Sequence, residues 1–167
     1  EMESNGKNID TQGIKLRVPA APTIFGSVGT DAQHSFFQAL HQGVEIIPIE
    51  IVVPIMSKLS HHDIPNLSQG QNELVINALA QCESLIFGNT AGKDSFRIFE
   101  GGRPSTLISW RQTDALSLGR LLSLYENASI VSGLVWGINS FNQFGVELGK
   151  EVARNISKGI NTSNISS

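Results

Sequence analysis

The sequence predicts an α/β layered domain, because segments with strand character alternate with segments with helical periodicity. Residues 44–53 and 105–110 are rich in β-branched and apolar side chains, which favours strands. Over residues 69–87, apolar side chains recur at helical spacing, and residues 113–125 repeat that pattern. This alternation is typical of layered α/β folds. The chain has 167 residues, enough for one domain with a sizeable core, and shows no second domain.

The first elements are short. Residues 1–22 are polar and then proline-rich, so we expect a loop. Residues 23–26 are a candidate for a short apolar strand. Thr30 and Gln33 match a capping box and predict one helix over residues 30–42. Its buried face would carry Phe36, Phe37 and Leu40.

Glycine and proline residues indicate where the elements in the middle of the chain end or are interrupted. Gly43 is a stop signal for the preceding helix. In the strand expected over residues 44–53, Pro48 lacks an amide donor and indicates an edge or a bulge. Loops are expected at residues 88–95 and 101–104.

Two helices are expected in the last third. Thr113 is the expected N-cap of the first, and apolar residues 129–138 extend it or start a new helix. Ser140 and Gln143 match a second capping box, which predicts a last helix to about Ile156.

Composition excludes several functional classes. The net charge is −3 and no run of Lys or Arg exists, so a nucleic-acid footprint is unsupported. No apolar run reaches the roughly 18 residues of a membrane span. Cys82 is the only cysteine, which excludes a disulfide within the chain and favours a reducing, cytoplasmic location. His61 and His62 could ligate a metal, but adjacent side chains point apart and no cysteine supports them, so we expect no metal site.

The last helix is amphipathic and carries a candidate ligand-binding face. Gln143, Glu147, Lys150 and Arg154 form its polar stripe, opposite Phe141, Phe144, Leu148, Val152 and Ile156. Gln143 and Lys150 lie two turns apart, about 10 Å along the axis, and could bracket a phosphosugar-sized ligand. The alternative is a solvated face with a Glu147–Lys150 pair.

The run GLVWGINSFNQFGVELGK at residues 133–150 resembles the second signature of the glucose-6-phosphate isomerase family, and the chain resembles the C-terminal part of that family. Other similar segments are MESNGK at 2–7, GSVGTDAQHSFFQALHQG at 26–43, FEGGRPSTLI at 99–108 and SLGRLLSLYE at 117–126. The resemblance implies a partial, SIS-like, three-layer sandwich with a parallel sheet between helices over residues 1–157, followed by a flexible tail, 158–167.

The resemblance also implies an activity. Family members interconvert glucose 6-phosphate and fructose 6-phosphate through an enediol, in glycolysis and gluconeogenesis, without a metal or other cofactor. By position, Glu3 matches the base carboxylate, His34 the ring-opening histidine and Lys150 the cation that assists ring opening, while Gln143 matches a substrate contact. The family histidine reaches the site from a neighbouring subunit, which implies a homodimer. The alternatives are a non-catalytic sugar-phosphate-binding module and a structural fragment that binds nothing.

The chain departs from the family pattern at several places. Ser27-Val28 stands where the family commonly has Glu-Pro, and Asp31-Ala32 stands where it has Asn-Gly. The family's N-terminal half, with its Ser/Thr phosphate cradle, has no counterpart in these residues. We therefore expect a fragment that is nearly inactive as an isomerase by itself.

Overall fold

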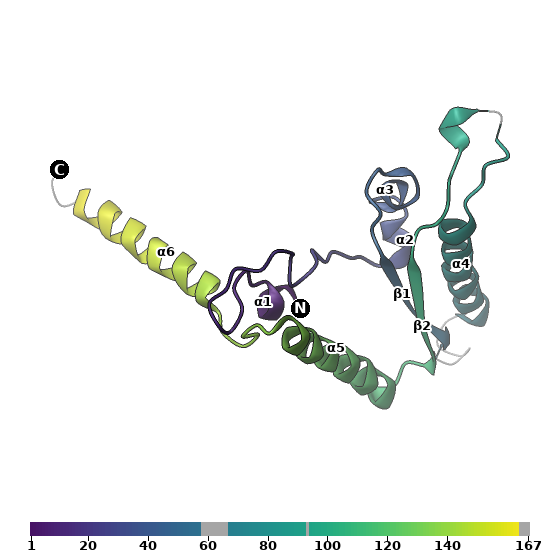
Figure 1. Cartoon of the computed structure of the whole chain (residues 1–167). Coiled ribbons are helices and arrows are strands. Elements are labelled where there is room, and N and C mark those ends of the chain that lie inside the picture. Colours follow the sequence, from purple (N-terminus) through teal and green to yellow (C-terminus); the bar gives the residue numbers. More distant parts are fainter. Residues whose placement is uncertain (58–66, 93, 164–167) are drawn as a thin grey trace. The chain divides into compact units, whose positions relative to one another are not determined.

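The computed structural model describes residues 1–57, 67–92 and 94–163, which form the elements labelled in Figure 1. The helices are α1 Met2–Asn5, α2 Gly29–Ala32, α3 Phe37–Gln42, α4 Leu67–Phe87, the 3-10 turn Ser95–Arg97, α5 Ala115–Trp136 and α6 Phe144–Ser163. The strands are β1 Ile49–Met56 and β2 Ser105–Gln112. The chain divides into two compact units, residues 25–122 and residues 1–24 with 123–167.

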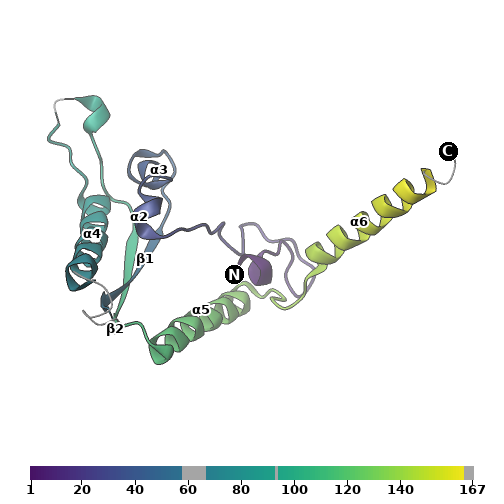
Figure 2. The same ribbon diagram turned by 180° about the vertical axis from the view of Figure 1, so that it is seen from behind.

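The unit of residues 25–122 is built on a parallel strand pair. β1 and β2 pair in parallel, with Ile49 opposite Ser105 and Met56 opposite Gln112. Parallel neighbours need a crossover connection, and here it contains α4, which lies beside the strands in both views (Figures 1 and 2). The Gln71 side chain of α4 donates a hydrogen bond to the Pro54 carbonyl of β1 at 2.5 Å. The predicted α/β class is therefore confirmed, with two parallel strands in the described residues.

A small apolar core is formed by side chains of α2, α3 and α4. Its buried members are Ala32, Phe37, Leu40 and Leu85, with Phe36, Ile47 and Ile49 packed against them. The buried Arg103 guanidinium donates to the carbonyls of Gly43, at 2.7 Å, and Glu45, at 3.1 Å. These bonds connect the segment after α3 to the residues that lead into β2.

The helix expected over residues 30–42 forms as two short helices instead. Val28 is the N-cap of α2 with no side-chain cap, so the capping box expected from Thr30 and Gln33 is wrong. The chain leaves helical geometry at Phe36, whose φ and ψ are −126° and 0°. Phe36 packs on the core and Phe37 is buried in it, which overrides a continuous helix. Gly43 ends α3, as predicted.

The first strand begins later than expected. Residues 44–48 lie outside β1, and Val44 is 98% exposed. β1 starts immediately after Pro48, and the Ile49 amide donates to the Pro104 carbonyl at 3.1 Å. Proline supplies no amide, so the ladder begins at the next residue. The strand expected at residues 23–26 does not form.

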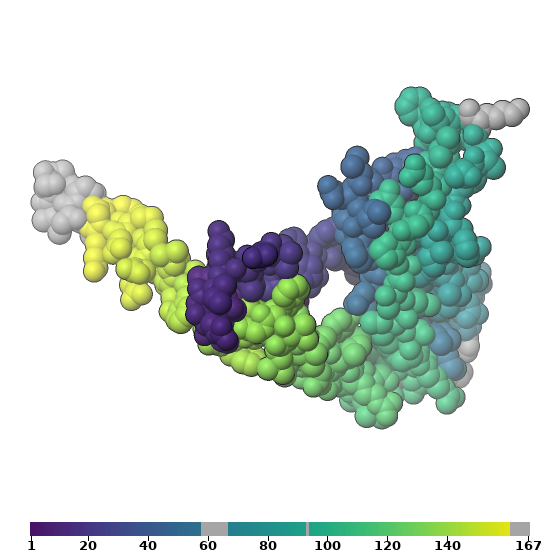
Figure 3. All heavy atoms as spheres, viewed as in Figure 1, coloured from purple at the N-terminus to yellow at the C-terminus, as the bar shows by residue number. Residues whose placement is uncertain are grey.

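The other unit joins the N-terminal segment to the C-terminal half of α5 and to α6. The purple N-terminal residues lie directly against the yellow-green residues before α6 (Figure 3). The Thr11 amide donates to the Gly137 carbonyl at 2.8 Å, across 126 positions of sequence. The expected loop over residues 1–22 is therefore interrupted by α1 and held by a bridge between Ile9 and Lys15.

The two long helices predicted in the last third of the chain both form, but not with the predicted N-cap residues. Asp114, rather than Thr113, caps α5, because its carboxylate accepts from the Ser117 amide at 2.7 Å. The apolar residues 129–136 extend that helix. α6 starts at Phe144 and continues to Ser163, beyond the end expected near Ile156. A boundary between a domain ending at 157 and a flexible tail stays a prediction.

Candidate functional site

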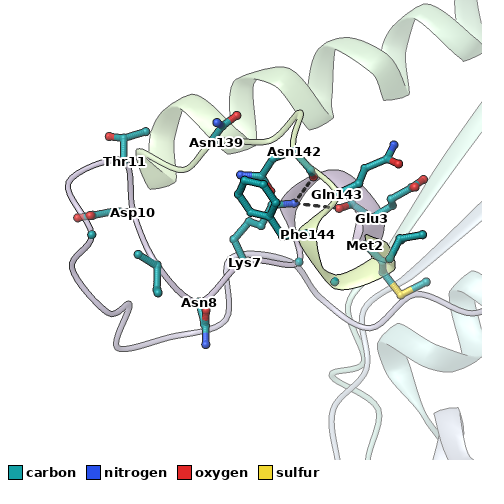
Figure 4. A pocket seen from close by; sticks show the side chains of 15 residues that line it. Met2, Glu3, Lys7, Asn8, Asp10, Thr11, Asn139, Asn142, Gln143 and Phe144 are labelled. Atoms are coloured by element: carbon teal, nitrogen blue, oxygen red, sulfur yellow. Dashed lines mark hydrogen bonds between the residues drawn. The ribbon is translucent and has the colours of Figure 1, made fainter. Parts of the chain in front are cut away.

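A pocket of about 920 Å³ lies within the unit formed by the two ends of the chain. One wall is α1 and the loop that follows it, and the other is the segment that leads into α6 (Figure 4). Glu3 and Gln143 both line this pocket, although 140 positions of sequence separate them. In Figure 4 their side chains extend toward the same side of the site. The structure thus brings together two of the four expected site residues.

Asn5 anchors the helix that carries Glu3. Its side chain is 0% exposed. The amide nitrogen donates to the Ser129 carbonyl at 2.8 Å and to the Glu1 carboxylate at 3.1 Å. The amide oxygen accepts from the Ser140 hydroxyl at 2.6 Å. One buried amide therefore fastens α1 both to α5 and to the segment before α6, which fixes the backbone near Glu3.

The Glu1 carboxylate belongs to the same hydrogen-bonded cluster. Partial burial raises the pKa of Glu1, but hydrogen bonds from Asn5, Ser129 and Ser132 and the charge of the amino terminus lower it. The net pKa lies below the usual value. The ionised form therefore stabilises the docked α1 above the unfolded-state pKa, and this contribution is lost as pH falls through the folded-state pKa.

Lys7 links the two walls of the pocket. Its ammonium donates to the carbonyls of Ser4, at 2.8 Å, Glu3, at 3.1 Å, and Asn142, at 3.1 Å. Figure 4 shows the bonds to Glu3 and Asn142 as dashed lines, and the bond to Asn142 joins the two walls. Lys7 is half-buried, whereas Glu3 is exposed and lines the pocket.

Gln143 occupies the N-cap position of α6. Its carbonyl accepts from the amides of Val146, at 3.0 Å, and Glu147, at 3.1 Å. Ser140, which the capping-box pattern predicts as the cap, instead directs its hydroxyl to Asn5. The start of α6 therefore places the Gln143 side chain beside the pocket. Neither the Gln143 amide group nor the Glu3 carboxylate bonds to another side chain or amide in the described part of the chain, so both are available to a ligand.

Lys150 and His34 are not among the residues that line this pocket. Lys150 is exposed on α6, and its carbonyl accepts from the Arg154 guanidinium at 3.2 Å. His34 is exposed in the turn between α2 and α3, where its amide donates to the Asp31 carbonyl at 3.1 Å. It belongs to the other unit. The roles of both residues stay predictions.

Sequence reasoning missed the two residues that organise the site, Asn5 and Lys7. Both lie in the MESNGK segment, whose resemblance drew attention only to Glu3. Their partners Ser140 and Asn142 lie 135 positions later. No local spacing pattern predicts contacts of that range.

Metal and membrane functions receive no support from the described residues. Across residues 1–57, 67–92 and 94–163, no three His, Cys, Asp or Glu side chains are grouped so as to hold a metal ion. His61 and His62 lie outside this part of the chain. None of the described helices is long and apolar enough to cross a membrane.

Comparisons with known proteins show which fold and which family this chain shares. The crystal structure of a glucose-6-phosphate isomerase from Chlamydia trachomatis D/UW-3/Cx matches 96% of this chain with a TM-score of 0.84 and 35% identity. This structural match, together with the parallel α/β unit, shows that the chain has the fold of part of that enzyme. The family model for phosphoglucose isomerase matches residues 1–167, and the chain belongs to this family.

Curated relatives give the same result and define the extent of the match. Glucose-6-phosphate isomerase from Albidiferax ferrireducens is 42% identical over 166 residues, which cover 99% of this chain and 30% of that protein. The enzyme of the same name from Chlorobium phaeobacteroides is 39% identical over 177 residues and covers 93% of this chain. The chain thus spans about 30% of the length of these curated relatives. Membership of the family expected from the sequence is confirmed.

Proposed function

We propose that this chain supplies part of the active site of an aldose–ketose isomerase that interconverts glucose 6-phosphate and fructose 6-phosphate. One observation carries the proposal: Glu3 and Gln143 line one pocket with their functional groups unoccupied by other described residues. They stand at the positions that match the base and a substrate contact of the family. The proposed role lies in glycolysis and gluconeogenesis in the cytoplasm.

The chemistry requires a base whose position is fixed. Isomerisation moves a proton between C2 and C1 of the open sugar through an enediol. A carboxylate such as that of Glu3 can take the proton from one carbon and return it to the other. The Gln143 amide offers a donor and an acceptor that can orient sugar hydroxyls near this carboxylate. This division of roles uses only the two side chains that share the pocket.

The test is a chimera in which this chain replaces the matching segment of the Albidiferax ferrireducens relative. We expect turnover of fructose 6-phosphate to glucose 6-phosphate in a coupled assay, within about tenfold of that relative, because the exchanged segments are 42% identical. A folded chimera that binds fructose 6-phosphate without turning it over would favour the non-catalytic binding module instead. The chain by itself is the second sample, and we expect its turnover to be far lower than that of the chimera.

His34 provides a separate prediction about ring opening. An imidazole is suited to transfer protons at the ring oxygen near neutral pH. We expect His34→Ala in the chimera to slow conversion of the cyclic hexose phosphate about tenfold or more, and that of an open-chain analogue much less. The control is His41→Ala, since His41 contacts the Gln81 side chain at 3.0 Å and is not a family site position. Equal losses on both substrates would exclude a ring-opening role for His34.

A homodimer forms part of this proposal, because the family histidine acts across a subunit interface. If His34 acts in this way, two impaired chimeras, one carrying Glu3→Gln and one His34→Ala, should complement each other when mixed under subunit exchange. About one quarter of the parental sites would then be restored in a random mixed dimer population.

A further inference from the structure

The ammonium of Lys7 satisfies backbone carbonyls that α1 leaves without partners. α1 ends after Asn5, and the next amides turn elsewhere: Gly6 N–H bonds to Met2 O, and Lys7 N–H bonds to Asn5 O. The carbonyls of Glu3 and Ser4 therefore receive no helical hydrogen bond. Both accept instead from the Lys7 side chain, at 3.1 Å and 2.8 Å.

The third bond of Lys7 reaches the opposite wall of the pocket. Its acceptor is the Asn142 carbonyl, at 3.1 Å, in the peptide unit that immediately precedes Gln143. One ammonium thus joins the peptide that carries the base carboxylate to the peptide that carries the substrate-contacting amide (Figure 4). An ammonium has three donors, and these three carbonyls use all of them.

We infer that Lys7 is a positioning residue for Glu3, which sets the distance between the Glu3 carboxylate and the Gln143 amide in the proposed isomerase site. This inference rests on the proposed function. Lys7 acts through Glu3 rather than on the substrate, because its donors are occupied by backbone. Its contribution differs from that of Asn5: Asn5 fastens α1 to Ser129 of α5, whereas Lys7 is the one of the two that bonds to the residue before Gln143.

The kinetic test uses Lys7→Met in the chimera, with Lys15→Met as the matched control. Lys15 is an exposed lysine of the same loop and does not line the pocket. A displaced base loses much of the benefit of proximity, so we expect Lys7→Met to lower kcat about 10–100-fold. KM should change less than about threefold, because the substrate contacts remain. Lys15→Met should leave both constants unchanged.

A double-mutant cycle separates positioning from general loss of structure. If Lys7 acts through Glu3, then Lys7→Met in a Glu3→Gln background should lower kcat by less than about threefold further. A purely structural role would lower kcat by the same factor in both backgrounds. Additive losses would therefore overturn the inference.

Hydrogen exchange on this chain tests the link without activity. Removing the ammonium frees the end of α1, so the amides of Asn5 and Gly6 should exchange about tenfold faster in Lys7→Met than in Lys15→Met. Unchanged exchange would overturn the link even if the chimera is active. An inactive parental chimera with faster exchange would instead contradict the proposed function and support the link between the two walls.

Discussion

Glu3→Gln in the chimera should lower kcat for isomerisation about 10²–10⁴-fold, the range typical for loss of a general acid–base group. The amide preserves the shape of the side chain but cannot accept a proton from C1 or C2. KM should change much less, because Glu3 is proposed to act on the reacting carbons rather than to bind the phosphate. Initial rates in both directions would measure this loss.

Glu151→Gln is the matched control for this substitution. Glu151 is an exposed carboxylate of α6 that does not line the pocket, so its loss should leave kcat unchanged. Exchange of the C2 proton with deuterated solvent gives an independent readout, since it requires the base but not completion of the reaction. Near-parental turnover and exchange in Glu3→Gln would show that Glu3 is not the base.

Gly133→Ala should destabilise the unit that holds the pocket by about 1–3 kcal/mol or more, the cost typical of overpacking. Gly133 is buried on α5 at the point where Ser140 and Asn5 meet. An added Cβ would overlap the Ser140 hydroxyl and lie 3.0 Å from the Asn5 amide oxygen. The methyl group would displace the hydrogen bond that anchors α1. Urea unfolding followed by the fluorescence of Trp136, in a Trp110→Phe background, would measure the change.

Gly149→Ala is expected to stabilise the protein, whereas Gly133→Ala destabilises it, so Gly149→Ala is a strong control. Gly149 lies inside α6 with nothing within 4 Å of an added Cβ. Alanine there should stabilise the helix by about 0.5–1 kcal/mol, because glycine loses more backbone entropy. Ser140→Gly should offset part of the cost of Gly133→Ala, since it removes the overlapping hydroxyl. Equal, small effects at both glycines would contradict the packing seen around Asn5.

Strong local patterns in the sequence were sufficient to predict the long helices and the second strand. Helical periodicity over residues 69–87 predicted α4, and a β-branched run predicted β2 from its first residue, Ser105. Apolar residues 129–136 extended α5 as one of the two expected outcomes. These patterns persist over several turns or strand positions, so no single tertiary contact outweighs them.

Short signals failed where burial or a distant partner decided the local structure. Phe36 packs on the core and interrupts the helix expected over residues 30–42. Ser140 matched a capping box, yet its hydroxyl donates to Asn5, and Gln143 takes the N-cap position of α6 without a side-chain cap. A single cap contributes about 1 kcal/mol, less than the cost of leaving a buried amide such as Asn5 unsatisfied.

The sequence by itself determined the α/β class, the long helices and, through resemblance, the family, and it predicted Glu3 and Gln143 as site residues. Only the tertiary structure decided that these two residues share a pocket and that Asn5 and Lys7 hold its walls together. The physical reason is the sequence separation over which each effect acts. Periodicity and capping act over a few residues, whereas the bonds of Asn5 and Lys7 close loops of 124 to 135 positions, which only the packed chain brings into contact.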